Sequence, residues 1–185
     1  MQIVVEITIM QHVANVLLIG YNKLMQWDLI TNIIVILAIL VMGAFFILGL
    51  YQWIRRKSLK KVDRTLLCMP IPMALVALTY LVFDKLFILN TRPNGSGEPS
   101  FPSTHTLIAA TIFFVTMIAL TKYIKNKKVL LILDIIMLVL VILMAIGRVL
   151  ANMHWPVDVI GGVAFAVIFT DIYYYALRHK GDKNE

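Results

Sequence analysis

Charged residues are scarce in this sequence, at 15% of 185 residues, and its 10 Asp and Glu are outnumbered by 17 Lys and Arg. Cysteine occurs once, as Cys68, which excludes an internal disulfide. Hydrophobic residues make up 61% of the chain, and the mean hydropathy is +0.87. These values exclude an ordinary soluble domain, so each polar residue that persists in the apolar background needs a physical reason.

The apolar residues are gathered in five long runs: residues 29–54, 65–83, 106–121, 129–147 and 159–177. Three runs carry no charge, and the last two contain a single acid each. A helix needs about 20 apolar residues to cross the hydrocarbon of a bilayer, and the shortest run reaches this length by including part of 101–105. The sequence therefore predicts an all-α, polytopic membrane helix bundle in one domain, residues 1–185, with a transmembrane core over 28–178.

Residues 1–27 are predicted to form an additional helix. Their polar residues recur at spacings of four, seven and four: Gln11, Asn15, Asn22 and Gln26. This pattern is typical of a helix that lies in the membrane interface. A sixth crossing is the alternative, since 16 uncharged residues separate Glu6 from Lys23. Residues 179–185 are expected to form a cytoplasmic tail.

Positive charge is concentrated in three places, which together hold 13 of the 17 Lys and Arg: residues 55–64, 122–128 and 178–183. Five crossings that begin near Asp28 place all three clusters on the same side of the membrane. The positive-inside rule identifies that side as cytoplasmic. The basic excess thus indicates topology and does not indicate nucleic-acid binding.

The opposite, outer face carries few cations, and we expect those present to be functional. Three of them, Lys85, Arg92 and Arg148, lie in polar stretches that also contain His105, His154 and Asp158. The predicted topology brings these stretches together at the outer ends of the helices. Fixed cations, imidazoles and a carboxylate are the groups needed to handle a phosphate without a metal ion.

Each stretch also has a structural explanation. Lys85 and Arg92, seven residues apart, would share a helix face if the helix continued, and alone they are explained by cations that reach lipid headgroups. Ser103 is a natural N-cap, and a helix N-terminus also binds anions. Together the stretches favour one site, because each structural explanation would have to hold independently on one face of a chain poor in charge.

His154 and Asp158 are four residues apart at the start of the last predicted helix, within reach of each other. An Asp that accepts the proton of one ring nitrogen leaves the lone pair of the other nitrogen free to act as a nucleophile. The structural alternative is an acid that stabilises the helix dipole.

The three stretches resemble the type-2 phosphatidic acid phosphatase superfamily, which includes vanadium haloperoxidases and glucose-6-phosphatase-like enzymes. The family pattern is Lys, six residues, Arg-Pro; Pro-Ser-Gly-His; and Ser-Arg, five residues, His, three residues, Asp. The chain matches its order and spacings over about residues 80–160: Lys85 to Arg92-Pro93, Pro102-Ser103-Thr104-His105, and Gly147-Arg148 to His154 and Asp158. Thr104 replaces a glycine and adds a Cβ atom near the phosphate, and Gly147 replaces a serine and removes a hydroxyl.

The resemblance implies a reaction and a role for each residue. His154 would attack phosphorus to form a phosphohistidine, Asp158 would orient it, and His105 would protonate the leaving oxygen. The phosphoryl oxygens would be held by the remaining motif residues: Lys85, Arg92, Ser103, Thr104 and Arg148. No metal ion or cofactor is expected.

The resemblance further implies an integral protein of the bacterial plasma membrane with an extracytoplasmic site and a lipid phosphate substrate. Undecaprenyl diphosphate, a carrier in cell-wall synthesis, is the preferred substrate, and phosphatidylglycerophosphate and phosphatidate are alternatives. Two other functions stay open from the residues. A metal-dependent hydrolase would use His105, His154 and Asp158 as ligands, and a non-catalytic protein would only bind or transport a lipid phosphate.

Overall fold

The computed structural model describes residues 2–179, and it describes side chains from Val16 onward. The elements in chain order are α1 (Gln2–Arg56), η1 (Leu59–Lys61), α2 (Arg64–Cys68), α3 (Pro70–Tyr80), η2 (Leu81–Leu86), α4 (Thr104–Tyr123), α5 (Lys127–Leu150) and α6 (Pro156–Arg178). Within the described range, the only β-structure is an isolated bridge between Thr91 and Pro99. The predicted all-α helix bundle is confirmed. Residues 180–185 of the predicted cytoplasmic tail lie outside the described range.

In the part of the chain that the structure describes, five helices are long and apolar enough to cross a membrane: Val16–Arg56, Arg64–Leu86, Thr104–Tyr123, Lys127–Leu150 and Pro156–Arg178. They coincide with the five predicted runs. The second span is assembled from α2, α3 and η2, because Pro70 lacks the N–H needed to continue an uninterrupted ladder of helical hydrogen bonds. The chain is an integral membrane protein built as a helix bundle.

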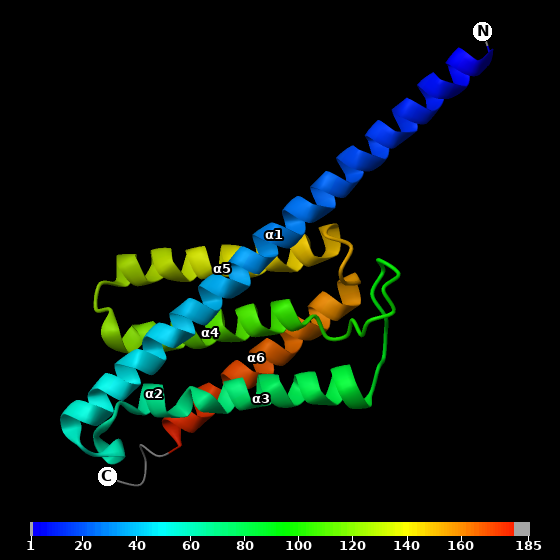
Figure 1. The fold of residues 1–185 in the computed structure, drawn as a ribbon. Coiled ribbons are helices and arrows are strands. Elements are labelled where there is room, and N and C mark those ends of the chain that lie inside the picture. The colour runs from blue at the N-terminus through cyan, green and yellow to red at the C-terminus, as the bar shows by residue number, and fades with distance from the viewer. Residues whose placement is uncertain (1, 180–185) are drawn as a thin grey trace.

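The N-terminal segment differs from the predicted separate helix. Residues 2–27 continue without a turn into the first span, so α1 is one helix of 55 residues, about 80 Å long at 1.5 Å per residue. No proline occurs between Gln2 and Arg56 to end it. Figure 1 shows the first part of α1 extending past the other helices, and the described side chains from Val16 to Gln26 are all exposed.

Helix α4 lies at the centre of the bundle and packs against α1, α3, α5 and α6. Small residues let the neighbours approach it closely, because Ala109, Ala110 and Ala119 are at most 1% exposed. Gly162 of α6 also approaches the start of α4 closely, since an added Cβ atom would lie 3.0 Å from the carbonyl oxygen of Ser103. This contact fixes the start of α4 against the start of α6.

The two ends of the bundle differ in chemistry. One end carries the C-terminus of α1, the α4–α5 connection and the C-terminus of α6 (Figure 1), which hold the described residues of the three basic clusters. Asp63 ties this end together by accepting hydrogen bonds from Gln52 at 2.9 Å and Tyr123 at 3.2 Å and pairing with Lys122 at 3.1 Å. The opposite end carries the 87–103 segment and the α5–α6 turn, and with them most of the predicted site residues.

Candidate active site

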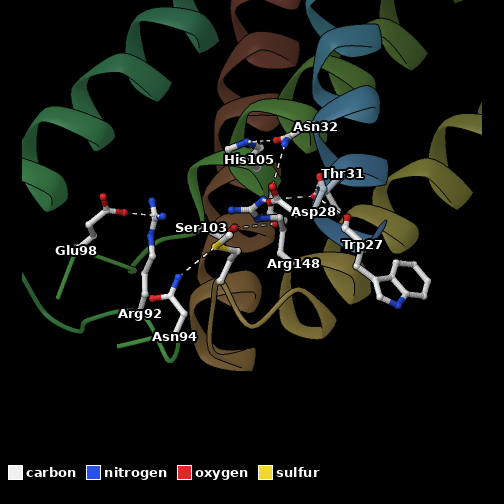
Figure 2. Close-up of polar contacts among 12 residues, drawn as sticks. Trp27, Asp28, Thr31, Asn32, Arg92, Asn94, Glu98, Ser103, His105 and Arg148 are labelled. Carbon is white, nitrogen blue, oxygen red and sulfur yellow. Dashed lines mark hydrogen bonds and ion pairs between the residues drawn. The ribbon is translucent and has the colours of Figure 1, made fainter. Parts of the chain in front are cut away.

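At the end opposite the basic clusters, residues from α1, the 87–103 segment, α4 and the end of α5 meet in one polar region (Figure 2). The α5–α6 connection adds His154, which contacts the 87–103 segment. The central side chains of this region are buried although they are polar: Ser103 and Asp158 are 0% exposed, Arg148 is 2% exposed and His154 is 4% exposed. Burying such groups is costly unless they are hydrogen-bonded or paired, so their partners define the site.

His154 is held by the main chain of Ser100. Its Nδ1 atom lies 2.9 Å from the Ser100 carbonyl oxygen, and because a carbonyl only accepts, Nδ1 carries the proton. The lone pair therefore sits on Nε2. Burial, together with the positive charge of Arg148, lowers the pKa of His154 to about 3. The imidazole is thus neutral near pH 7, as a nucleophile requires.

Asp158 does not make the expected hydrogen bond to His154. Its Oδ2 atom lies 3.8 Å from Nδ1 of His154 and instead accepts a hydrogen bond from the backbone N–H of Trp155 at 2.8 Å. Asp158 is the third residue of α6, so this bond is one half of a capping box. The carboxylate stabilises the helix that carries it and remains close to the imidazole, while the Ser100 carbonyl sets the proton position.

Arg148 is paired with α1. Its Nη1 atom lies 2.8 Å from Oδ1 of Asp28 and 3.3 Å from the hydroxyl of Thr31. The Arg148 side chain is 3% exposed and that of Asp28 is 27% exposed, so the carboxylate neutralises a buried guanidinium. The Nε atom of Arg148 is buried and has no hydrogen-bond partner among the described residues.

His105, near the start of α4, also contacts α1. Its Nε2 atom lies 3.0 Å from Oδ1 of Asn32, and Nδ2 of Asn32 lies 3.2 Å from Oδ2 of Asp28. Figure 2 shows the resulting chain of contacts from His105 through Asn32 and Asp28 to Arg148. The predicted general acid and one predicted phosphate ligand are thus joined through two residues of α1.

The two residues before His105 begin α4. Ser103 occupies the N-cap position, as expected, but its hydroxyl contacts Thr106 Oγ1 at 3.0 Å and makes no hydrogen bond to the helix backbone. Its backbone N–H donates to the carbonyl oxygen of Asp158 at 2.9 Å. Thr104 is the first helical residue and is half-buried. The start of α4 is therefore locked to the helix that follows His154.

Arg92 lies in the segment between the second and third spans. Its Nη1 atom pairs with Oε2 of Glu98 at 2.6 Å, so Glu98 neutralises this guanidinium within the same segment. The Nε atom of Arg92, like that of Arg148, is buried without a partner in the described part of the chain. Two guanidinium groups therefore retain donors that phosphate oxygens could use.

Lys85 is not brought into contact with the other predicted residues. The second span ends at Leu86, so Arg92 does not continue the helix face of Lys85. The Lys85 side chain is 63% exposed, and its Nζ atom lies 2.7 Å from Oδ2 of the adjacent Asp84. Its proposed contact with phosphate stays a prediction.

Comparison with known proteins identifies the family to which the chain belongs. A family model described as the PAP2 superfamily matches residues 84–182. The chain belongs to the PAP2 superfamily. The chain is a phosphatase of this superfamily. No curated protein matches the sequence significantly.

Two solved structures are similar to this chain. A transmembrane PAP2-type phosphatidylglycerolphosphate phosphatase from Bacillus subtilis is 21% identical, with a TM-score of 0.62, and the match covers 92% of this chain and 88% of that one. LpxE from Aquifex aeolicus is 23% identical, with a TM-score of 0.44 and coverage of 83% and 94%. The first likeness supports the same helix arrangement over nearly the whole chain.

Three residues that contact the candidate site were missed from the sequence: Asp28, Thr31 and Asn32. All three precede the stretch that the family model matches. The available signal was an acid and an amide four residues apart at the outer end of the first span, where polar side chains share one face of the helix. Nothing in their local sequence indicates that this face meets Arg148 and His105.

Proposed function

We propose that this PAP2 protein hydrolyses a lipid phosphate or diphosphate at the extracytoplasmic face of a bacterial plasma membrane. His154 is the nucleophile, and the reaction passes through a phosphohistidine without a metal ion. The observation that carries the proposal is the fixed tautomer of His154, whose Nδ1 proton is held by Ser100 at 2.9 Å. A buried, neutral imidazole with a free Nε2 lone pair suits attack on phosphorus.

The charges around this imidazole suit phosphoryl transfer, which depends mainly on positioning and on stabilising the charge of the phosphoryl oxygens. Arg148 and Arg92 each keep a buried Nε donor without a partner in the described residues. Planar guanidinium groups bind phosphate oxygens through parallel hydrogen bonds. His105, on the helix that begins beside Ser103, is the candidate acid for the leaving oxygen.

A lipid substrate is supported by an apolar cavity of about 760 Å³ between α1, the second span and α4. None of the predicted catalytic or phosphate-binding residues lines it, but Ile108 does, and Ile108 lies one helical turn from His105. A lipid whose headgroup lies at the candidate site could extend its hydrocarbon chain past Ile108 into this cavity. The basic clusters at the other end support an outward-facing site, by the positive-inside rule.

Undecaprenyl diphosphate is our preferred substrate. Phosphatidylglycerophosphate is the second candidate, because the Bacillus subtilis protein with the same fold is named as a phosphatidylglycerolphosphate phosphatase. Phosphatidate remains a third. All of the proposed binding residues are assigned to the phosphate group, which the three candidates share, so the candidates must be separated by measured turnover.

The test is phosphate release from each lipid by the purified protein in detergent, comparing the wild type with His154→Ala. The matched control is His179→Ala, because His179 is an exposed histidine just after α6 at the opposite end of the bundle. We expect wild-type release from at least one lipid, loss of release in His154→Ala with lipid binding retained, and no loss in the control. Unchanged release in His154→Ala would rule out the phosphohistidine route. Lipid binding without release by the wild type would identify a non-catalytic binding protein.

A further inference from the structure

Asn32 bridges the predicted general acid and the acid that neutralises Arg148. Its Oδ1 atom lies 3.0 Å from Nε2 of His105, and its Nδ2 atom lies 3.2 Å from Oδ2 of Asp28. We propose that Asn32 is a positioning residue that keeps a proton on Nε2 of His105, so that Nδ1 is the nitrogen that exchanges protons with the substrate. This inference rests on the proposed function, because it concerns His105, the general acid of the proposed reaction.

The direction of the hydrogen bonds follows from the partner at the far end. Asp28 forms an ion pair with the buried guanidinium of Arg148 at 2.8 Å, and a carboxylate in an ion pair can only accept hydrogen bonds. The Asn32 atom that faces Asp28 is therefore the NH₂ group, and the atom that faces His105 is the carbonyl oxygen. Because this oxygen also only accepts, the His105 Nε2 atom must donate, and its proton is fixed.

The proton assignment gives each nitrogen of the two histidines a separate task. When the Nε2 lone pair of His154 forms a bond to phosphorus, the bond from phosphorus to the leaving oxygen breaks. That oxygen keeps the electron pair and takes the Nδ1 proton of protonated His105. His105 is left neutral with its remaining proton on Nε2, still bound to Asn32. The ring therefore need not rotate or exchange its tautomer.

The second step reverses the transfer. The free Nδ1 lone pair of His105 takes a proton from water as the water oxygen bonds to phosphorus, and the bond from phosphorus to His154 Nε2 breaks with its electron pair returning to nitrogen. Phosphate leaves, and His105 is again protonated at both nitrogens. The carbonyl of Asn32 stabilises that charged form as well as the neutral one, since both carry the Nε2 proton.

The same contacts fix where His105 sits relative to Arg148. Asp28 binds Asn32 with one carboxylate oxygen and Arg148 with the other. The candidate acid on α4 and a candidate phosphate ligand on α5 are thus held to one point on α1. Hydrogen-bonded partners behind a reacting group commonly change activity by about 10- to 100-fold when removed, as second-layer residues of metal sites do.

A role limited to holding α1 against α4 is the competing explanation, and two measurements separate it from positioning. The first is ¹⁵N NMR of His105 in detergent-solubilised protein. The His105 ring signals are assigned as those that are absent from the spectrum of His105→Gln. We expect neutral His105 to carry its proton on Nε2 in the wild type and to mix both tautomers in Asn32→Leu, a change close in volume that removes both polar atoms. An unchanged tautomer in Asn32→Leu would overturn the proposal.

The second measurement is a mutant cycle on the lipid that the wild type hydrolyses best. We expect Asn32→Leu to lower kcat about 10- to 100-fold with little change in KM. In a His105→Ala background the same substitution should have almost no further effect, because the two residues act as a unit. Equal losses in both backgrounds would indicate a purely structural role. Asn32→Ala repeats the cycle if Asn32→Leu folds poorly.

Asn22→Leu is the matched control, because Asn22 is an exposed asparagine on the same helix, ten residues before Asn32. It should retain the wild-type kcat and the wild-type His105 tautomer. A different result would contradict the proposed function itself: the wild type would release phosphate from none of the lipids. The tautomer measurement needs no turnover and still decides the role of Asn32 in that case.

Discussion

Gly147 of α5 makes room for Thr31 of α1. A Cβ atom at Gly147 would lie 2.6 Å from Cγ2 of Thr31, which is closer than carbon atoms can approach without displacement. Thr31 is fully buried, and its hydroxyl lies 3.3 Å from Nη1 of Arg148. The superfamily pattern resembled by the sequence has a serine at Gly147. In this chain a hydroxyl reaches Arg148 from Thr31 of the neighbouring helix α1.

Restoring the family serine should therefore harm this protein. We expect Gly147→Ser to push α1 from α5, lengthen the contact between Asp28 and Arg148, and lower both the thermal unfolding midpoint and kcat/KM. Overpacking of this kind typically costs about 1–3 kcal/mol. Thermal unfolding and phosphate release measure the two effects.

The double variant Gly147→Ser with Thr31→Ser is the matched test, because Thr31→Ser removes only the Cγ2 atom that clashes and keeps the hydroxyl. It should recover most of the lost unfolding midpoint and activity. Full activity in Gly147→Ser alone would show that α1 does not pack this closely in the working enzyme.

The hydrogen bond from His154 to the Ser100 carbonyl leads to a second prediction, which concerns the effect of substituting Asp158 on kcat. Asp158→Asn keeps an oxygen that can accept the Trp155 N–H, while the His154 tautomer stays fixed by Ser100. We expect kcat to fall about 10-fold or less, against the ~10⁴-fold loss seen where a carboxylate itself sets the tautomer of a catalytic histidine. Steady-state phosphate release measures this.

Asp158→Ala provides the comparison, since it also removes the bond that caps α6. Its unfolding midpoint should fall below that of Asp158→Asn, by an amount corresponding to about 1 kcal/mol. A loss of kcat near ~10⁴ in Asp158→Asn would instead mean that the carboxylate rotates to His154 when substrate binds.

Much of this architecture was predictable because its signals are local. Five uncharged runs near bilayer length predicted the five spans, and three basic clusters predicted which helix ends lie together. The motif spacings located Arg148, His154 and Asp158, because the turn between α5 and α6 is too short to separate them. These are properties of neighbouring residues, which the order of the chain preserves.

The partners of these residues were not predictable, because they come from distant segments or from the backbone. Asp28 is 120 positions from Arg148, and Asn32 is 73 positions from His105. The contact of His154 with the Ser100 carbonyl could not be predicted from residue types, since every residue carries a backbone carbonyl. Lys85 was predicted from its motif spacing, but the adjacent Asp84 holds it at 2.7 Å, a local competitor that the motif does not include.

The absence of a metal ion from the proposed reaction makes a third prediction. In the proposed reaction Arg148 and Arg92 supply the positive charge that a metal would otherwise provide, and no three His, Cys, Asp or Glu side chains described between Val16 and His179 are grouped to hold one. We expect phosphate release to persist after incubation with a chelator and dialysis. Loss of activity that zinc or magnesium restores would favour a metal-dependent hydrolase.

The ionisation of His154 makes the last prediction. Its pKa is lowered to about 3 by burial and by the charge of Arg148, whereas an unfolded chain has a histidine pKa of about 6.5. Between these values the unfolded protein binds a proton that the folded protein does not, so the free energy of unfolding decreases as the pH falls, by up to about 1.4 kcal/mol per pH unit.

In phosphate-free buffer the His154 ring signals in NMR should not titrate between pH 5 and 8. The drop in unfolding midpoint from pH 7 to pH 5 should be smaller in His154→Asn than in the wild type, and unchanged in His179→Asn, which replaces an exposed histidine. A His154 signal that titrates near pH 6.5 would show that water reaches the imidazole and that its neutral form is not enforced by burial.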